Sequence, residues 1–240
     1  MAQELTIKTP SGFQQYKTLV RKDLQREFRT KEMLTSMGIY ALLVLIVYGV
    51  ALANTSSSFD VLQMSGGLLW ALIVFTSLLG LNRSFSYEKE NGCLEGILLV
   101  PLDRSVIYLS KATSNLIFLL VVEVIVVPLF YFFFLTTVTV TPSFWLIVPS
   151  LLLGTIGVAG VGTLLATITV NTRGKDVMLA VLFIPIMFPL LYACVAATTA
   201  VIVGAEGFMD VYLQSLALAA GYDVIMVLVC WLLYDAVVSS

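Results

Sequence analysis

Two acidic residues stand inside long apolar runs of the sequence, where a charged group is costly. Glu123 lies five residues before Pro128 in the third run, and Asp223 lies about two turns into the last run. Pro128 also withdraws one backbone donor, which frees the carbonyl of Val124. Each carboxyl group could line a substrate path or gate, or a protonated carboxyl could form a hydrogen bond between helices. The sequence leaves both interpretations open.

The sequence offers few other residues or motifs for catalysis or ligand binding. The chain has no histidine, the commonest metal and haem ligand and the usual general base near neutral pH. Cys93, Cys194 and Cys230 are far apart and form no CxxC pattern, and no nucleotide-binding loop or nucleophile elbow is present. We therefore expect a non-catalytic protein without a metal site or a directly bound cofactor. Any ATP-driven work must be done by a partner in trans. Without a broad basic domain, we expect no nucleic-acid partner.

The elements that position these residues are apolar helices. Hydrophobic residues make up 59% of the 240 residues, and they occur in runs long enough to cross a bilayer. The sequence predicts an all-α integral membrane protein with a single transmembrane domain over residues 33–240. Its six spans are predicted at Leu34 to Ala53, Ser65 to Leu81, Val106 to Leu135, Phe144 to Val170, Val177 to Val203 and Leu216 to Val237.

The 13 basic residues all fall on one side of this predicted topology. The opposite connections carry Asp60, Glu206 and Asp210 but no cation. By the positive-inside rule, both termini are predicted to be cytoplasmic, in the bacterial inner membrane. The basic residues precede the first span (Lys8, Lys17, Arg21, Lys22, Arg26, Arg29, Lys31), flank the loop between spans two and three (Arg83, Lys89, Arg104, Lys111) or separate spans four and five (Arg173, Lys175).

A cytoplasmic amphipathic segment is predicted over residues 1–32. Its apolar residues recur at three- and four-residue steps, with cations on the other faces, which predicts a helix lying along the cytoplasmic leaflet of the membrane lipid. The alternative is a solvated basic tail. The apolar positions are Phe13, Tyr16, Val20, Leu24 and Phe28.

The connection over residues 83–104 is too apolar for an ordinary cytoplasmic loop. Asn91 and Gly92 supply a turn, apolar residues then follow at helical spacing at Leu94, Ile97 and Leu98, and Pro101 ends the segment. The sequence therefore predicts a short helix whose apolar face is covered by lipid, by the protein's own helices or by the groove of a partner.

Two further patterns concern helix packing. Small residues in the fourth span allow close approach of helix backbones; they include Gly154, Thr155, Ala159 and Thr163. In the fifth span, Pro185 and Pro189 predict a kink, as Pro128 does in the third. These features could serve a moving gate or simply shape the bundle.

Three stretches make the chain resemble the cytochrome c maturation haem exporter B family, the membrane subunit of an ABC transporter complex. They are Glu-Asn-Gly-Cys-Leu-Glu-Gly-Ile-Leu-Leu-Val-Pro-Leu-Asp-Arg at 90–104, Leu-Leu-Leu-Gly-Thr-Ile-Gly at 151–157, and Leu-Phe-Ile-Pro-Ile-Met-Phe-Pro-Leu-Leu at 182–191. The first is the most specific of the three. The resemblance covers nearly the whole chain in order.

The resemblance implies the fold of ABC-2 type exporters, with a coupling segment that sits on an ABC ATPase subunit. It further implies a haem-handling membrane subunit, a small membrane subunit and a periplasmic haem chaperone as partners, with two copies of this chain per complex. Haem would be a substrate rather than a resident cofactor. An ABC-2 permease for a lipid or drug, and a membrane scaffold, remain alternatives. The implied coupling residues are Glu90, Asn91, Gly92, Leu94, Glu95, Ile97, Leu98 and Pro101.

Overall fold

The computed structural model describes residues 11–53, 61–90, 104–135, 142–170, 172 and 174–239. The predicted coupling residues from Asn91 to Pro101 lie outside this part of the chain, as does the side chain of Glu90. The described elements are α1 (Gly12–Thr30), α2 (Glu32–Ala53), α3 (Val61–Glu90), α5 (Arg104–Phe134), the short 3-10 helix η1 (Pro142–Leu146), α6 (Ile147–Thr169), α7 (Lys175–Val203) and α8 (Phe208–Ser239).

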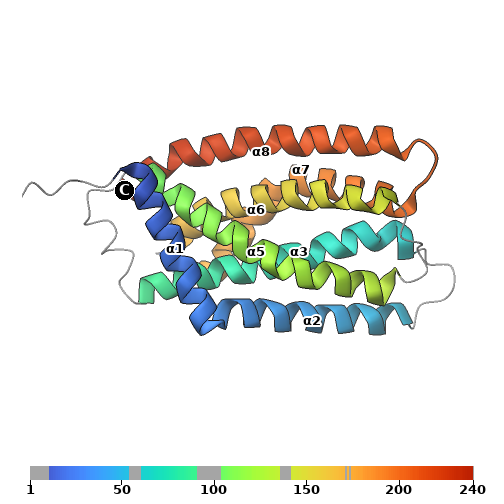
Figure 1. Ribbon diagram of the computed structural model, residues 1–240, viewed down its shortest axis with the longest axis horizontal. Helices are drawn as coiled ribbons and strands as arrows, with labels where there is room; N and C mark the ends of the chain where they lie inside the picture. The colour runs from blue at the N-terminus through green and yellow to red at the C-terminus, as the bar shows by residue number, and fades with distance from the viewer. Residues whose placement is uncertain are drawn as a thin grey trace, which may run out of the picture.

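Six of these helices, α2, α3 and α5 to α8, are long and apolar enough to cross a membrane. They run lengthwise beside one another, and no strand occurs within the described ranges (Figure 1). The predicted fold class, an all-α integral membrane protein of six spans, is therefore confirmed for this part of the chain.

Two helices are longer than the apolar runs from which they were predicted. α3 covers Val61–Glu90, so residues 83–90 of the predicted loop are helical, and the helix extends beyond both edges of the predicted span. α8 begins at Phe208, eight residues before the predicted edge at Leu216. Apolar composition marks only the part of a helix that lies in hydrocarbon, whereas the backbone hydrogen bonds of the helix continue into the polar interface.

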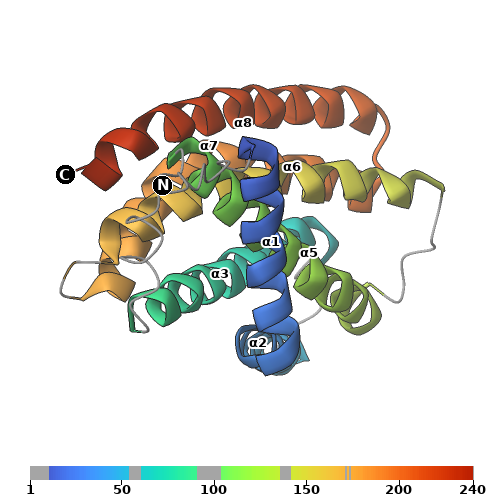
Figure 2. The same cartoon turned by 60° about the vertical axis from the view of Figure 1, so that its left-hand side comes forward.

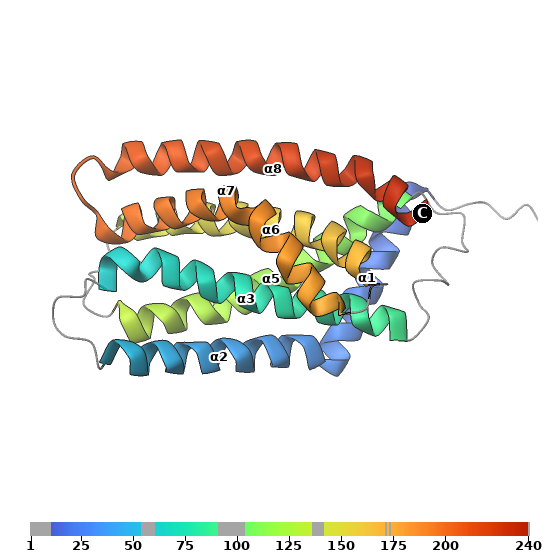
Figure 3. The same ribbon diagram turned by 180° about the vertical axis from the view of Figure 1, so that it is seen from behind.

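The helix α1 lies across one end of the bundle instead of along it. Figure 2, in which this end comes forward, shows α1 running over the helix ends from α2 toward α8. Its direct contacts are with α5 and α2. The C-terminal ends of α3 and α8 and the N-terminal end of α5 lie at the same end of the molecule (Figures 1 and 3).

The helix α6 is the centre of the bundle and contacts α3, α5, α7 and α8. Its glycines make this possible, since each leaves room for a side chain from a neighbouring helix. Trp70 of α3 fills the space at Gly154, and Leu81 fills the space at Gly162. On another side, Leu190 and Asp223 occupy the space at Gly157. A β-carbon at any of these three glycines would collide with its neighbour.

Two helices continue through prolines in their interior. Pro128 lies inside α5, and Pro185 and Pro189 lie inside α7. The ribbon of α7 changes direction along its length, whereas α2 runs nearly straight (Figure 3).

Candidate functional site

Buried polar side chains gather along α6, and the two predicted intramembrane acids are among them. Glu123 of α5 is 7% exposed and Asp223 of α8 is 5% exposed. Glu123 meets α6 at Thr155, and Asp223 meets it at Gly157. Since each helical residue turns about 100°, positions two apart face nearly opposite directions. The structure therefore places one carboxyl group on each side of the central helix.

Glu123 is held by a hydrogen bond between helices. The hydroxyl of Thr155 lies 2.7 Å from Glu123 Oε1 and 2.7 Å from the carbonyl oxygen of Leu151. A hydroxyl has one hydrogen, so it can donate to only one of these acceptors at a time. Both contacts are satisfied together when a protonated Glu123 donates to Thr155 and Thr155 donates to Leu151. This geometry favours the interhelical hydrogen bond over a charged group facing a path.

The cavity beside Glu123 is small. Its volume is about 10 Å³, and its walls come from α2, α3 and α5, including Met37, Thr76 and Ser77. A cavity needs roughly 10 to 15 Å³ to hold one water molecule. Glu123 therefore has room beside it for a single water at most, and not for a substrate of the size of haem.

Asp223 differs from Glu123 because neither of its carboxyl oxygens has a hydrogen-bond partner among the described residues. The group lies against the backbone of α6 at Gly157, beside Leu190 of α7. Buried polar groups normally have partners, so an unpartnered one requires a reason. A role in a substrate path or gate is therefore better supported for Asp223 than for Glu123.

A second polar layer on α5 was not predicted from the sequence. The amide nitrogen of Asn115 donates to Thr163 Oγ1 at 2.9 Å, and the hydroxyl of Tyr108 donates to the carbonyl oxygen of Gly160 at 3.2 Å. Asn115 and Glu123 are eight residues apart, a spacing that keeps two positions near the same face of a helix. The polar face of α5 could have been predicted from this eight-residue spacing.

The predicted packing residues of α6 divide into two kinds. Thr155 and Thr163 return their hydroxyl groups to their own helix, at the carbonyl oxygens of Leu151 and Ala159. Gly154 instead receives the ring of Trp70 from α3, and Ala159 is buried. The close approach of neighbouring helices therefore takes place at glycines, on several sides of α6.

The helix α1 is fixed to the bundle by polar contacts. Asp23 and Lys111 of α5 form an ion pair at 2.7 Å, with side chains 3% and 4% exposed. Tyr16 donates a hydrogen bond to Thr113 at 3.0 Å, and the carboxylate of Glu27 accepts the backbone N–H of Leu34 at 2.9 Å. Residues 12–30 of the predicted segment therefore form a docked helix and not a solvated tail. Lys111, assigned from the sequence to the flank of a loop, is instead buried inside the fold.

The predicted apolar face of α1 is split by this docking. Tyr16, Val20 and Leu24 are half-buried, whereas Phe13 and Phe28 are 74% and 54% exposed.

Within the described residues, no group of three or more potential metal-ligating side chains occurs.

We expect Glu123→Gln to preserve the stability of the bundle and Glu123→Leu to reduce it. Glutamine can still bond Thr155, whereas leucine removes a hydrogen bond of about 0.6 kcal/mol, with about 1.7 kcal/mol as the upper end for membrane helices. Thermal unfolding of the purified protein measures the difference. Normal assembly with lost ATP-driven turnover in Glu123→Gln would contradict the structural role and support a substrate path.

These observations define an all-α, multi-pass integral membrane protein. The family model described as "CcmB protein" matches residues 14–238, which covers nearly all of α1 and every span. The chain therefore belongs to the CcmB family, the cytochrome c maturation haem exporter B family. Members of this family are membrane permease subunits, and the chain is a membrane component of haem export in cytochrome c maturation. No curated protein matches the chain.

Proposed function

We propose that this subunit couples ATP hydrolysis by a separate ABC ATPase to release of a haem-loaded chaperone on the opposite side of the membrane. Family membership makes the chain a membrane component of haem export in cytochrome c maturation. The coupling role is supported by the way the helices on either side of residues 91–103 contact the central helix.

The segment over residues 91–103 joins the end of α3 to the start of α5. Both helices hold α6 directly. From α3 come Trp70 and Leu81 at two of its glycines, and from α5 come Tyr108 and Glu123 at Gly160 and Thr155. A force applied to this segment would therefore reach α6 from two sides. Because close-packed interiors transmit strain, such a force would move α6 against α7 and α8.

The ATPase would bind at the end of the bundle crossed by α1. The ends of α3 and α8 and the start of α5 lie there, and every basic residue of the sequence belongs to this side of the topology (Figure 1). The positive-inside rule supports a cytoplasmic position for this end. The proposal therefore has both termini in the cytoplasm and the chain in the bacterial inner membrane.

A mechanical role suits the interior better than haem passage does. The cavity at Glu123 has room for about one water molecule, and the sequence has no histidine to serve as an axial ligand. In this proposal haem is handled by partner subunits: a haem-handling membrane subunit, a small membrane subunit and the periplasmic chaperone. Two copies of this chain complete the complex, with ATP bound only on the ATPase.

The triple variant Leu94→Ser, Ile97→Ser and Leu98→Ser tests the coupling segment. Serine removes the apolar surface expected to fill a groove of the ATPase, at about 1.5 to 3 kcal/mol for each large apolar side chain buried. We expect the ATPase to be lost on co-purification and the complex to lose its ATP turnover. The measurement is affinity purification of the intact complex followed by an ATPase assay.

The matched control is Leu94→Met, Ile97→Leu and Leu98→Met, which keeps apolar surface and volume and should keep the ATPase bound. Retention of the ATPase with normal turnover in the serine variant would refute the coupling assignment. If the unsubstituted complex hydrolyses ATP without any link to chaperone release, the subunit is a scaffold and not a coupling element.

A further inference from the structure

The helix α1 separates its charges by sign. Its two acidic side chains, Asp23 and Glu27, are only 2% and 3% exposed and are turned into the protein. Asp23 pairs with Lys111, and Glu27 accepts the backbone N–H of Leu34. The bases of α1 remain on the outside, with Lys17, Arg21, Lys22 and Arg29 exposed and Arg26 half-buried. The outward surface of the helix is therefore cationic without acidic side chains of its own to balance it.

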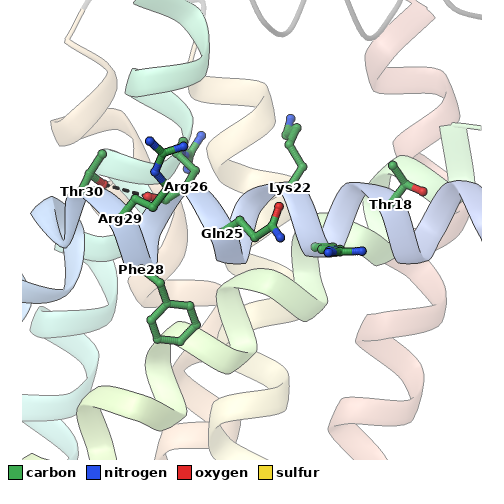
Figure 4. Close-up of a pocket in the computed structure, with 8 residues that line it drawn as sticks. Thr18, Lys22, Gln25, Arg26, Phe28, Arg29 and Thr30 are labelled. Carbon is green, nitrogen blue, oxygen red and sulfur yellow. Dashed lines mark hydrogen bonds between the residues drawn. The ribbon is translucent and has the colours of Figure 1, made fainter.

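An open hollow of about 980 Å³ lies on this outward surface, and its described lining comes entirely from α1 (Figure 4). Four cations line it, namely Arg21, Lys22, Arg26 and Arg29, and no acidic residue is among the described lining residues. Lys22 already contacts Asp23 at 3.4 Å. Arg21 and Arg29 have no ion-pair partner within the described ranges. The hollow is thus suited to an anion, with two guanidinium groups available for it.

An exposed aromatic ring on the same helix indicates which kind of anion the hollow would bind. Phe28 is 54% exposed and lines the same hollow. In Figure 4 it points away from Lys22, Arg26 and Arg29, to the opposite side of the helix. Since α1 lies across the end of the transmembrane bundle, this arrangement matches an interfacial helix, with its apolar side at acyl-chain depth and its cations at phosphate depth.

We propose that the hollow on α1 binds the headgroup phosphate of an anionic phospholipid, with Arg21 and Arg29 contacting the phosphate and Phe28 contacting the first part of an acyl chain. An acidic protein surface would satisfy the arginines but would leave the ring of Phe28 uncovered. A free phosphate ion shares the arginine chemistry but has no acyl chain for Phe28. The site concerns lipid and does not depend on the coupling role proposed above.

The test uses the full-length chain purified in detergent and stripped of lipid. Phosphatidylglycerol or phosphatidylcholine with identical acyl chains is titrated in, and bound lipid is counted by native mass spectrometry. We expect preferential binding of phosphatidylglycerol. Arg29→Gln and Arg21→Gln should each weaken it about fivefold, the equivalent of about 1 kcal/mol per cation near an anionic lipid surface. The double variant should weaken it about 25-fold.

Lys17→Gln is the matched control, because Lys17 is exposed on the same helix but does not line the hollow. An equal loss in Lys17→Gln would mean diffuse attraction and would overturn the site. Competition by soluble glycerol 1-phosphate as effective as that by the lipid would mean a site for free phosphate. Unchanged lipid binding in the double variant, together with a lost ATPase, would assign the surface to a protein partner. Unchanged thermal unfolding of the variants excludes misfolding as the cause of a loss.

Discussion

Replacing Gly154 by alanine is expected to destabilise the bundle by about 3 kcal/mol, at the upper end of the range for an overpacked core. The new β-carbon would collide with the ring of Trp70 and would lie 3.0 Å from the sulfur of Cys194. Trp70 cannot easily withdraw, because it is 1% exposed and its indole N–H donates to Thr198 at 3.0 Å. Moving the ring would break a buried hydrogen bond as well as the packing.

Thiol labelling during heating measures this effect directly. Cys194 and Cys230 are each 1% exposed, so a thiol-reactive dye reaches them only when the bundle opens. Cys93 lies outside the described residues, and we replace it by serine in every variant compared.

The control for Gly154→Ala is Gly221→Ala, since a β-carbon at Gly221 in α8 meets nothing within 4 Å. There the substitution should be neutral or should stabilise the helix by about 0.5 to 1 kcal/mol. Equal unfolding temperatures for the two alanine variants would show that α6 does not pack against α3 as described.

Lys111→Met is expected to cost about 3 kcal/mol, at the lower end of the range for breaking a buried pair, because it removes the buried cation of Asp23 and leaves only the partly exposed Lys22 at 3.4 Å. The two side chains are 2.7 Å apart and nearly inaccessible. Adding Asp23→Leu should restore most of the stability, since apolar replacement of both members of a buried pair is often neutral or better. The same thiol-labelling assay compares the unfolding of the unsubstituted protein, of Lys111→Met and of the double variant.

The exposed ion pair between Arg83 and Glu32 provides the comparison. Its nitrogen and oxygen are 2.8 Å apart, close to the distance in the buried pair, but the side chains are 45% and 64% exposed. Arg83→Met should therefore cost about 0 to 1 kcal/mol. A Lys111→Met protein as stable as the Arg83→Met protein would mean that α1 is not held by the buried pair.

The spans were predictable because a helix that crosses the hydrocarbon core needs about 20 consecutive apolar residues, and such a run is visible in the local sequence. Leu34 to Ala53, for example, matches α2 within two residues. The ends of α3 and α8 were not predictable in this way, since helix beyond the hydrocarbon depends on backbone hydrogen bonds and not on hydropathy. The intramembrane acids were found from the sequence for the same local reason: an acid in an apolar run is conspicuous.

The partners of buried groups were not predictable from local pattern. Asp23 stands beside Lys22 in a basic helix and looks like a solvated surface acid, while its main partner lies 88 residues away. Likewise, the small residues of α6 indicated close helix packing but not which helices pack there. Only the fold shows that Gly154, Gly157 and Gly162 receive side chains from three different helices. Such pairings depend on where distant segments meet in space, which a single sequence does not state.

The contacts of α1 also impose an order on the making of this protein. Glu27 finds its partner, the N–H of Leu34, only seven residues later, so the elbow between α1 and α2 can form as soon as both leave the ribosome. Asp23 must wait until α2, α3 and the first turns of α5 have been synthesised, because Lys111 is the eighth residue of α5. Until then α1 can bend at its elbow but cannot dock across the growing bundle. The ion pair therefore forms after the elbow does, on a chain whose first two spans have been synthesised and whose third has begun.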